Sequence, residues 1–131
     1  MYGIGACECK VDPLLKDIFA EAKRTVENWN GRLIFVYLPE WSRYPEKVNL
    51  CRKRFLNTGK SEVLSVIKDL QIPIIDIESV FSSHPDPLSL FPFRLYGHYN
   101  AEGYRVVTEQ VEKYISDNRI NSEPEKVNQP Y

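Results

Sequence analysis

The amino-acid sequence predicts an α/β fold with a parallel sheet, and three observations support this. Two short apolar runs, residues 33–38 (LIFVYL) and 72–77 (IPIIDI), are typical of strands that are buried on both faces. Amphipathic helical patterns precede, separate and follow these runs. Strands that alternate with helices in this way favour parallel pairing through right-handed crossovers.

The length of 131 residues corresponds to one domain, which we expect at residues 1–117, followed by a polar tail at residues 118–131. A net charge of −1 does not favour binding to nucleic acid or to an anionic membrane. No apolar run approaches the roughly 18 residues that span a bilayer, and the N-terminus lacks the basic-then-apolar order of a signal peptide. We therefore expect a cytoplasmic protein without a nucleic-acid or membrane partner.

The first helix has recognisable ends. Asp12 is a good N-cap, and Pro13 takes a position whose N–H is unpaired in any helix. Apolar residues recur at helical spacing over residues 15–29. Asn30 and Gly31 then tolerate the left-handed backbone that closes a helix, so we expect the helix to end there.

Between the two strands we expect two helices. One covers residues 45–56 and ends by Gly59, and Ser61 caps the next. After the second strand, prolines and a glycine make residues 80–97 irregular, and Asn100 then caps a last helix. The apolar face of this last helix comprises Tyr104, Val107, Val111 and Tyr114.

A sheet of two parallel strands leaves both of its edges open, and two-stranded sheets are marginal even when they are antiparallel. Three explanations remain at this point. A further strand lies within residues 1–11, another copy of the chain completes the sheet as a homo-oligomer, or the chain is the C-terminal part of a longer protein. The sequence favours the third explanation because of the motif that follows.

The segment 96–104 (YGHYNAEGY) is the most informative stretch of the chain. It comes after the second strand, at the end of a parallel sheet where ligands bind. His98 stands two residues before the cap of the last helix, which fixes its backbone. A fixed histidine in this place suits a general base that must aim one ring nitrogen at a nucleophile.

This segment resembles the last motif block of SGNH (GDSL-type) hydrolases, with His98, Asn100, Gly103 and Tyr104 in register. The resemblance implies a three-layer α/β/α, flavodoxin-like domain of which this chain is the C-terminal part. It also implies hydrolysis or acyl transfer at a small-molecule ester or an acylated sugar, with His98 as the catalytic base.

The chain departs from the family pattern in three respects. The block with the nucleophilic serine and the Gly and Asn blocks of the oxyanion hole are absent, and Leu95 stands where the family has an aspartate. We therefore expect the isolated chain to be inactive. Asp86 is the candidate acid partner of His98, although a turn in His-Pro-Asp-Pro also explains it. Asp76 fits a structural carboxylate better, and a dyad of His98 with a backbone carbonyl stays open.

Aromatic residues surround the motif and give two interpretations. Trp41, Phe93, Tyr96 and Tyr99 are candidate substrate-binding residues, or they close the end of the sheet as core. The alternative function is a non-catalytic SGNH-like module that binds a partner or a carbohydrate through these residues.

Other residues with catalytic or metal-binding chemistry have less context. His84 and Ser42 lie in no motif, and Ser42 lacks the glycine-flanked turn of a nucleophile. We expect Cys7, Cys9 and Cys51 to be reduced thiols. A zinc site would combine these cysteines with a histidine, but the usual Cys-x2-4-Cys spacing is missing. The sequence predicts no metal and no cofactor.

Overall fold

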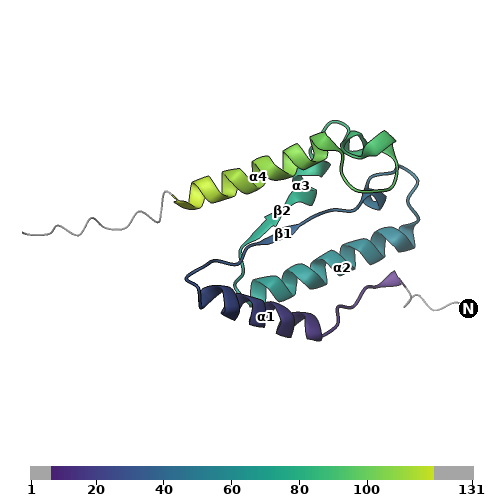
Figure 1. Ribbon diagram of the computed structural model, residues 1–131. Helices are drawn as coiled ribbons and strands as arrows, with labels where there is room; N and C mark the ends of the chain where they lie inside the picture. Colours follow the sequence, from purple (N-terminus) through teal and green to yellow (C-terminus); the bar gives the residue numbers. More distant parts are fainter. Residues whose placement is uncertain (1–6, 120–131) are drawn as a thin grey trace, which may run out of the picture.

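The computed structural model describes residues 7–119 and has a mixed α/β fold with a two-stranded parallel sheet at its centre. β1 (Phe35–Tyr37) and β2 (Ile74–Asp76) pair in register, with Val36 opposite Ile75 (Figure 1). Both predicted strands are therefore confirmed, but each is only three residues long.

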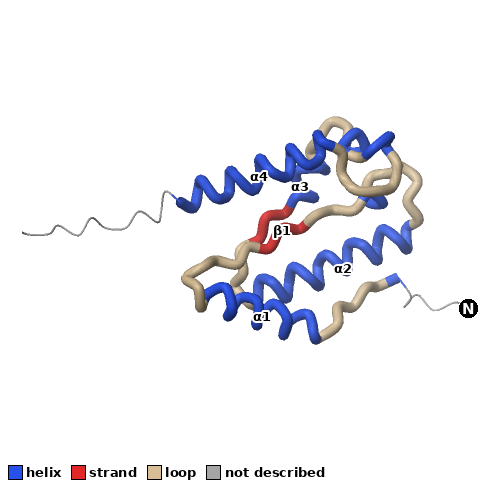
Figure 2. The backbone as a smooth tube through the Cα atoms, viewed as in Figure 1, coloured by secondary structure: helices blue, strands red, loops and turns tan. Residues whose placement is uncertain are grey.

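Within residues 7–119, four α-helices surround the two strands. They are α1 (Leu14–Glu27), α2 (Leu50–Asp69), α3 (Ile77–Ser82) and α4 (Ala101–Arg119). α1 and α2 lie on one side of the strands and α4 lies on the other (Figure 1), and loops with short 3-10 turns connect them (Figure 2). The predicted domain boundary at residues 117/118 falls inside α4, and residues 120–131 of the expected tail lie outside the described part. No helix within residues 7–119 is long and apolar enough to cross a membrane.

α1 starts close to the predicted place but ends at Glu27, with Asn28 as its C-cap, before the predicted Asn30 and Gly31. The side chain of Asp12 accepts a hydrogen bond from the Leu14 N–H at 2.9 Å, which satisfies one free donor of the first turn. At the other end, Asn30 adopts a left-handed backbone with φ 57°.

The prediction of two helices around Gly59 is wrong, because α2 is one continuous helix. Asn49 begins it by accepting a hydrogen bond from the Cys51 N–H at 2.8 Å. Gly59 lies in the middle and allows the N-terminal segment to approach. A Cβ atom at Gly59 would lie 3.2 Å from both Cβ and Sγ of Cys9. Helical contacts on either side outweigh the cost of one glycine, which is only about 1 kcal/mol.

Cys7 and Cys51 form a disulfide, whereas Cys9 is free. The expectation of three reduced thiols is therefore wrong for two of the cysteines. The bond joins the segment before α1 to the first turn of α2, 44 residues further along the chain. Sequence spacing did not indicate this pair because the contact depends on how α1 docks on α2.

The core lies between the sheet and α4. Its buried members come from β2, α3 and the loop that follows: Ile75, Ile77, Phe81, Leu90 and Phe91. β1 is only half buried, contrary to the expectation of burial on both faces, and Leu38 just after it is 52% exposed. The reason is the small sheet, since β1 has β2 on one side and no strand within residues 7–119 on the other.

Asn100 and Gly103 attach the start of α4 to the preceding loop. The Asn100 side chain accepts from the Gly103 N–H at 3.0 Å and donates to the Ser89 carbonyl at 2.7 Å. The Asn100 N–H donates to the Leu90 carbonyl at 3.0 Å. A Cβ atom at Gly103 would lie 2.6 Å from that same carbonyl oxygen. Two residues of the motif at 96–104 thus have a structural role, and the predicted cap at Asn100 is confirmed.

Gly103→Ala is expected to destabilise the protein by about 1–3 kcal/mol, because backbone has to move to admit the methyl group. Chemical denaturation monitored by circular dichroism measures this change. Ser116→Ala, at an exposed site on the same helix, is the control and should change stability by less than about 0.5 kcal/mol. Equal effects of the two substitutions would contradict the close contact at Gly103.

Candidate functional site

The loops that follow the two strands meet at the carboxyl end of the sheet. Trp41, just after β1, donates its indole N–H to the Arg94 carbonyl at 3.0 Å. The Trp41 and Tyr96 rings meet edge to face, with 6.2 Å between their centroids. The fold therefore brings together two of the predicted substrate-binding residues, although they are far apart in sequence.

Phe93 and Tyr96 project from this loop into solvent, with exposed fractions of 92% and 77%. The loop is held in an unusual conformation, since Phe93 and Arg94 both have a left-handed backbone, with φ 52° and 60°. Non-glycine residues adopt this conformation at a cost, so the surrounding contacts must hold it. The Trp41 hydrogen bond to the Arg94 carbonyl is one such contact.

Tyr99 behaves differently from the other predicted binding residues. Its ring packs against Phe81 and Phe91, and its hydroxyl donates to the Pro39 carbonyl. Burial raises the pKa of the Tyr99 phenol. Of the two interpretations made from the sequence, the core interpretation fits Tyr99, whereas Phe93 and Tyr96 are exposed and lie outside the core.

His98 lies in the same loop and is exposed. Its candidate partner Asp86 is engaged elsewhere: the carboxylate forms an ion pair with Arg94, and this hydrogen bond lowers the pKa of Asp86. The Asp86 N–H donates to Nδ1 of His84 at 3.0 Å, which is a turn within His-Pro-Asp-Pro. The hydrogen bonds of residues 7–119 thus include none between Asp86 and His98.

A largely buried charged cluster, which was not predicted from the sequence, lies beside these loops. Arg43, whose side chain is only 6% exposed, pairs with Glu78 at 3.2 Å. Lys60 from α2 reaches both Asp76 at 2.7 Å and Glu78 at 2.9 Å. Arg43 also donates to the Tyr37 hydroxyl at 2.7 Å, so the cluster links β1, β2, α2 and α3.

Asp76 and Glu78 stabilise the charged form of Lys60. Burial alone would lower the pKa of the Lys60 ammonium, but hydrogen bonds and charges from Asp76 and Glu78 outweigh it and raise the pKa. Asp76 in addition accepts from the Glu78 N–H at 3.1 Å, which caps α3. This agrees with the interpretation of Asp76 as a structural carboxylate at the strand end.

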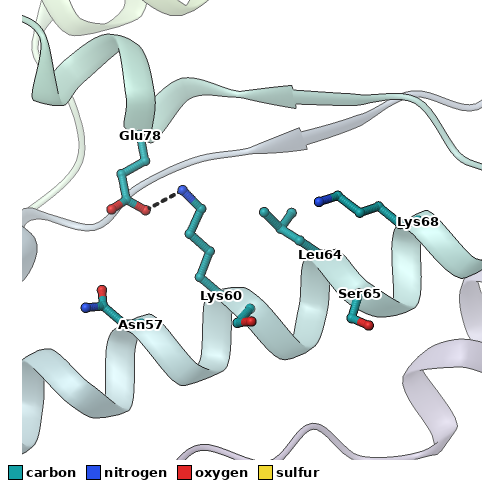
Figure 3. Close-up of a pocket in the computed structure, with 7 residues that line it drawn as sticks. Asn57, Lys60, Leu64, Ser65, Lys68 and Glu78 are labelled. Atoms are coloured by element: carbon teal, nitrogen blue, oxygen red, sulfur yellow. Dashed lines mark ion pairs between the residues drawn. The ribbon is translucent and has the colours of Figure 1, made fainter.

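Two hollows border the cluster and share Asn57 and Glu78 in their walls. The larger, of about 500 Å³, runs along α2, and Figure 3 shows Lys60 turned from that helix toward Glu78. The smaller, of about 310 Å³, includes Ser42 and Arg43. Ser42 accepts a long hydrogen bond of 3.5 Å from Arg52. Within residues 7–119 it forms no hydrogen bond with a histidine.

Comparison with protein-family models, with curated proteins and with solved structures finds no match to this chain. The candidate site therefore has to be judged on its own geometry. That geometry consists of a rigid, charge-paired end of the sheet that carries an exposed histidine and exposed aromatic rings.

Glu78→Gln is expected to destabilise the protein by about 2–3 kcal/mol, because Arg43 loses the counter-charge of Glu78 while Lys60 keeps that of Asp76. Thermal or chemical denaturation near pH 7 measures the loss. Glu21→Gln is the matched control, since it breaks the exposed pair with Arg24 and should cost less than about 1 kcal/mol. If both substitutions cost the same, Glu78 does not hold the cluster together.

Proposed function

We propose that this chain is the C-terminal, histidine-bearing part of an SGNH-like hydrolase domain that acts on a small-molecule ester or an acylated sugar. The observation that carries the proposal is the position of His98, in a loop beyond the carboxyl ends of β1 and β2 and directly before the capped helix α4. In parallel α/β folds this is where catalytic groups gather.

The arrangement of the helices supports a larger, flavodoxin-like three-layer fold. α2 connects the two parallel strands, and α1 contacts α2 on the same side of the sheet. A right-handed crossover through α1 would place a preceding strand beside the open edge of β1. The added segment would also cover apolar side chains of α1 such as Leu14 and Ile18, which are 58% and 54% exposed.

In the complete domain a serine from a segment that precedes Met1 would attack the ester carbonyl. His98 would take the serine proton and then deliver it to the leaving alcohol. Asp86 is held by Arg94, so the group that orients His98 is supplied by the completing segment or by a backbone carbonyl. Trp41 and Tyr96 would line the approach to the histidine.

The 131-residue chain alone is expected to show no turnover of p-nitrophenyl acetate above that of free imidazole, because it lacks the serine block. His98→Ala should leave this background unchanged, and His84→Ala serves as the histidine control. Turnover that His98→Ala abolishes and His84→Ala preserves would contradict the proposal, because the chain would then contain its own nucleophile.

A second candidate function is a non-catalytic module that binds a carbohydrate. The observation that favours it is the exposure of Phe93 and Tyr96 beside Trp41, on a loop that the fold holds in a fixed conformation. Exposed apolar side chains that gather in one place mark interaction sites, and flat rings provide rigid contact area.

This candidate is tested by retention of the chain on cellulose, chitin and xylan. The chain should bind at least one of these polysaccharides, and the double variant Phe93→Ala, Tyr96→Ala should lose at least tenfold in affinity. Trp29, just after α1, is 75% exposed, about as much as Tyr96. The Trp29→Ala variant is the control and should bind normally. Absence of binding, or equal losses in both variants, would dismiss the module.

A further inference from the structure

The disulfide between Cys7 and Cys51 lies at the surface, at the beginning of α2. Cys51 follows the cap residue Asn49 by two positions, and it is exposed. Cys7 belongs to the segment that leads into α1. The bond therefore fastens one helix to the start of another, in a place that a reagent can reach.

An open hollow of about 320 Å³ borders Cys51. Asn49, Cys51, Arg52 and Phe55 line it. The Arg52 guanidinium lies over the Phe55 ring, 5.9 Å from its centroid, and also reaches Glu40 at 3.2 Å. The hollow thus combines an apolar wall with a cation at the position of the disulfide.

The electrostatics of this place favour a sulfur anion. Cys51 belongs to the first turn of a 20-residue helix, where unpaired N–H groups and the helix dipole stabilise negative charge. Cysteines at helix N-termini and beside arginine are the ones that exist as thiolates and react with disulfides. Both features apply to Cys51.

The free thiol of Cys9 is held away from Cys51 in the folded chain. Cys9 packs on Gly59, and its N–H donates to Thr58 at 2.9 Å. Gly59 is eight residues from Cys51, which is about 12 Å along the helix axis. Disulfide exchange needs Cα atoms within about 7 Å, so Cys9 would have to leave its place first.

We propose that the Cys7–Cys51 disulfide is a site of thiol–disulfide exchange with an external dithiol that enters at Cys51. One thiolate of the dithiol attacks Sγ of Cys51, the Cys7–Cys51 bond breaks, and Cys7 leaves as a thiolate that takes a proton. The second thiolate of the dithiol then attacks the dithiol's first sulfur, which is bonded to Cys51 in the mixed disulfide. Cys51 leaves as a thiolate and the dithiol becomes a cyclic disulfide, so two electrons pass to the protein.

Reduction loosens the attachment of α1. Without the disulfide, the segment before α1 keeps the exposed Glu8–Arg54 ion pair at 2.5 Å and the Cys9 hydrogen bond to Thr58. α1 has no fully buried side chain, and its own contacts are the Phe19–Phe35 ring contact, the Lys23 hydrogen bond to the Leu70 carbonyl at 2.8 Å and the exposed Lys16–Asp69 ion pair. The site thus couples the redox state of the surroundings to the docking of α1 on α2.

Exchange is tested on the full oxidised chain with a brief pulse of glutathione, whose mixed disulfide is trapped by alkylation before a second thiolate can resolve it. After alkylation of free thiols, peptide mass spectrometry is expected to find glutathione on Cys51 and the alkyl group on Cys7 and Cys9. Hydrogen exchange of residues 7–27 should rise after reduction with dithiothreitol, while that of β2 stays constant. A glutathione adduct on Cys7, or reduction only in denaturant, would overturn the proposal.

The role of Arg52 is tested by the rate of reduction. Arg52→Gln is expected to slow reduction by dithiothreitol about two- to fivefold at low salt, as loss of one nearby charge at a helix N-terminus would. The effect should shrink at 0.5 M salt because of screening. Lys53→Gln is the matched control, since Lys53 does not line this hollow. Equal rates for the two variants would contradict entry at Cys51.

Discussion

The structure depends on one constraint, which is that β1 and β2 have only each other as partners within residues 7–119. Three paired residues per strand cannot bury both faces of a sheet, so β1 remains half exposed. Groups at the carboxyl end of the strands therefore supply much of the cohesion, together with Ile67 of α2 and Ile72, which are also buried. The aromatic core around Phe81 and Phe91 closes one side of the sheet. The charged cluster around Glu78 links the strands to α2 on the other.

This distribution of contacts also determines where chemistry is possible. The charged cluster is internally paired, so it holds the end of the sheet rigid rather than presenting a reactive group. The loop beyond this cluster exposes Phe93, Tyr96 and His98 to solvent. A rigid support that carries exposed groups is what a site requires before a partner or a further segment completes it. Both proposed functions use this same loop. In the first, His98 acts as the catalytic base, and in the second, the rings of Phe93 and Tyr96 bind the carbohydrate.

Features set by local chemistry were predictable from the sequence, and features set by long-range contacts were not. Asp12 and Asn100 cap their helices as expected because capping involves only neighbouring N–H groups. Gly59 misled the prediction, since a glycine inside a helix is recognised as a packing position only when Cys9 is seen beside it. The Arg43–Glu78 pair, 35 residues apart, could not be found because charged residues carry no periodic signal. For the candidate site, the loop could be identified from the sequence, but its contacts, such as the Asp86–Arg94 ion pair, could not.

The motif at residues 96–104 divides into two kinds of residue. Asn100 and Gly103 are required to attach α4, whereas no contact of the described chain requires His98. The central claim is that His98 belongs to a larger domain that also supplies a serine. Sequencing of the full-length coding transcript tests it most directly. The account predicts a reading frame that continues upstream of Met1 and encodes a Gly-Asp-Ser block followed by further strand and helix patterns. An in-frame stop codon with no such block upstream would contradict it.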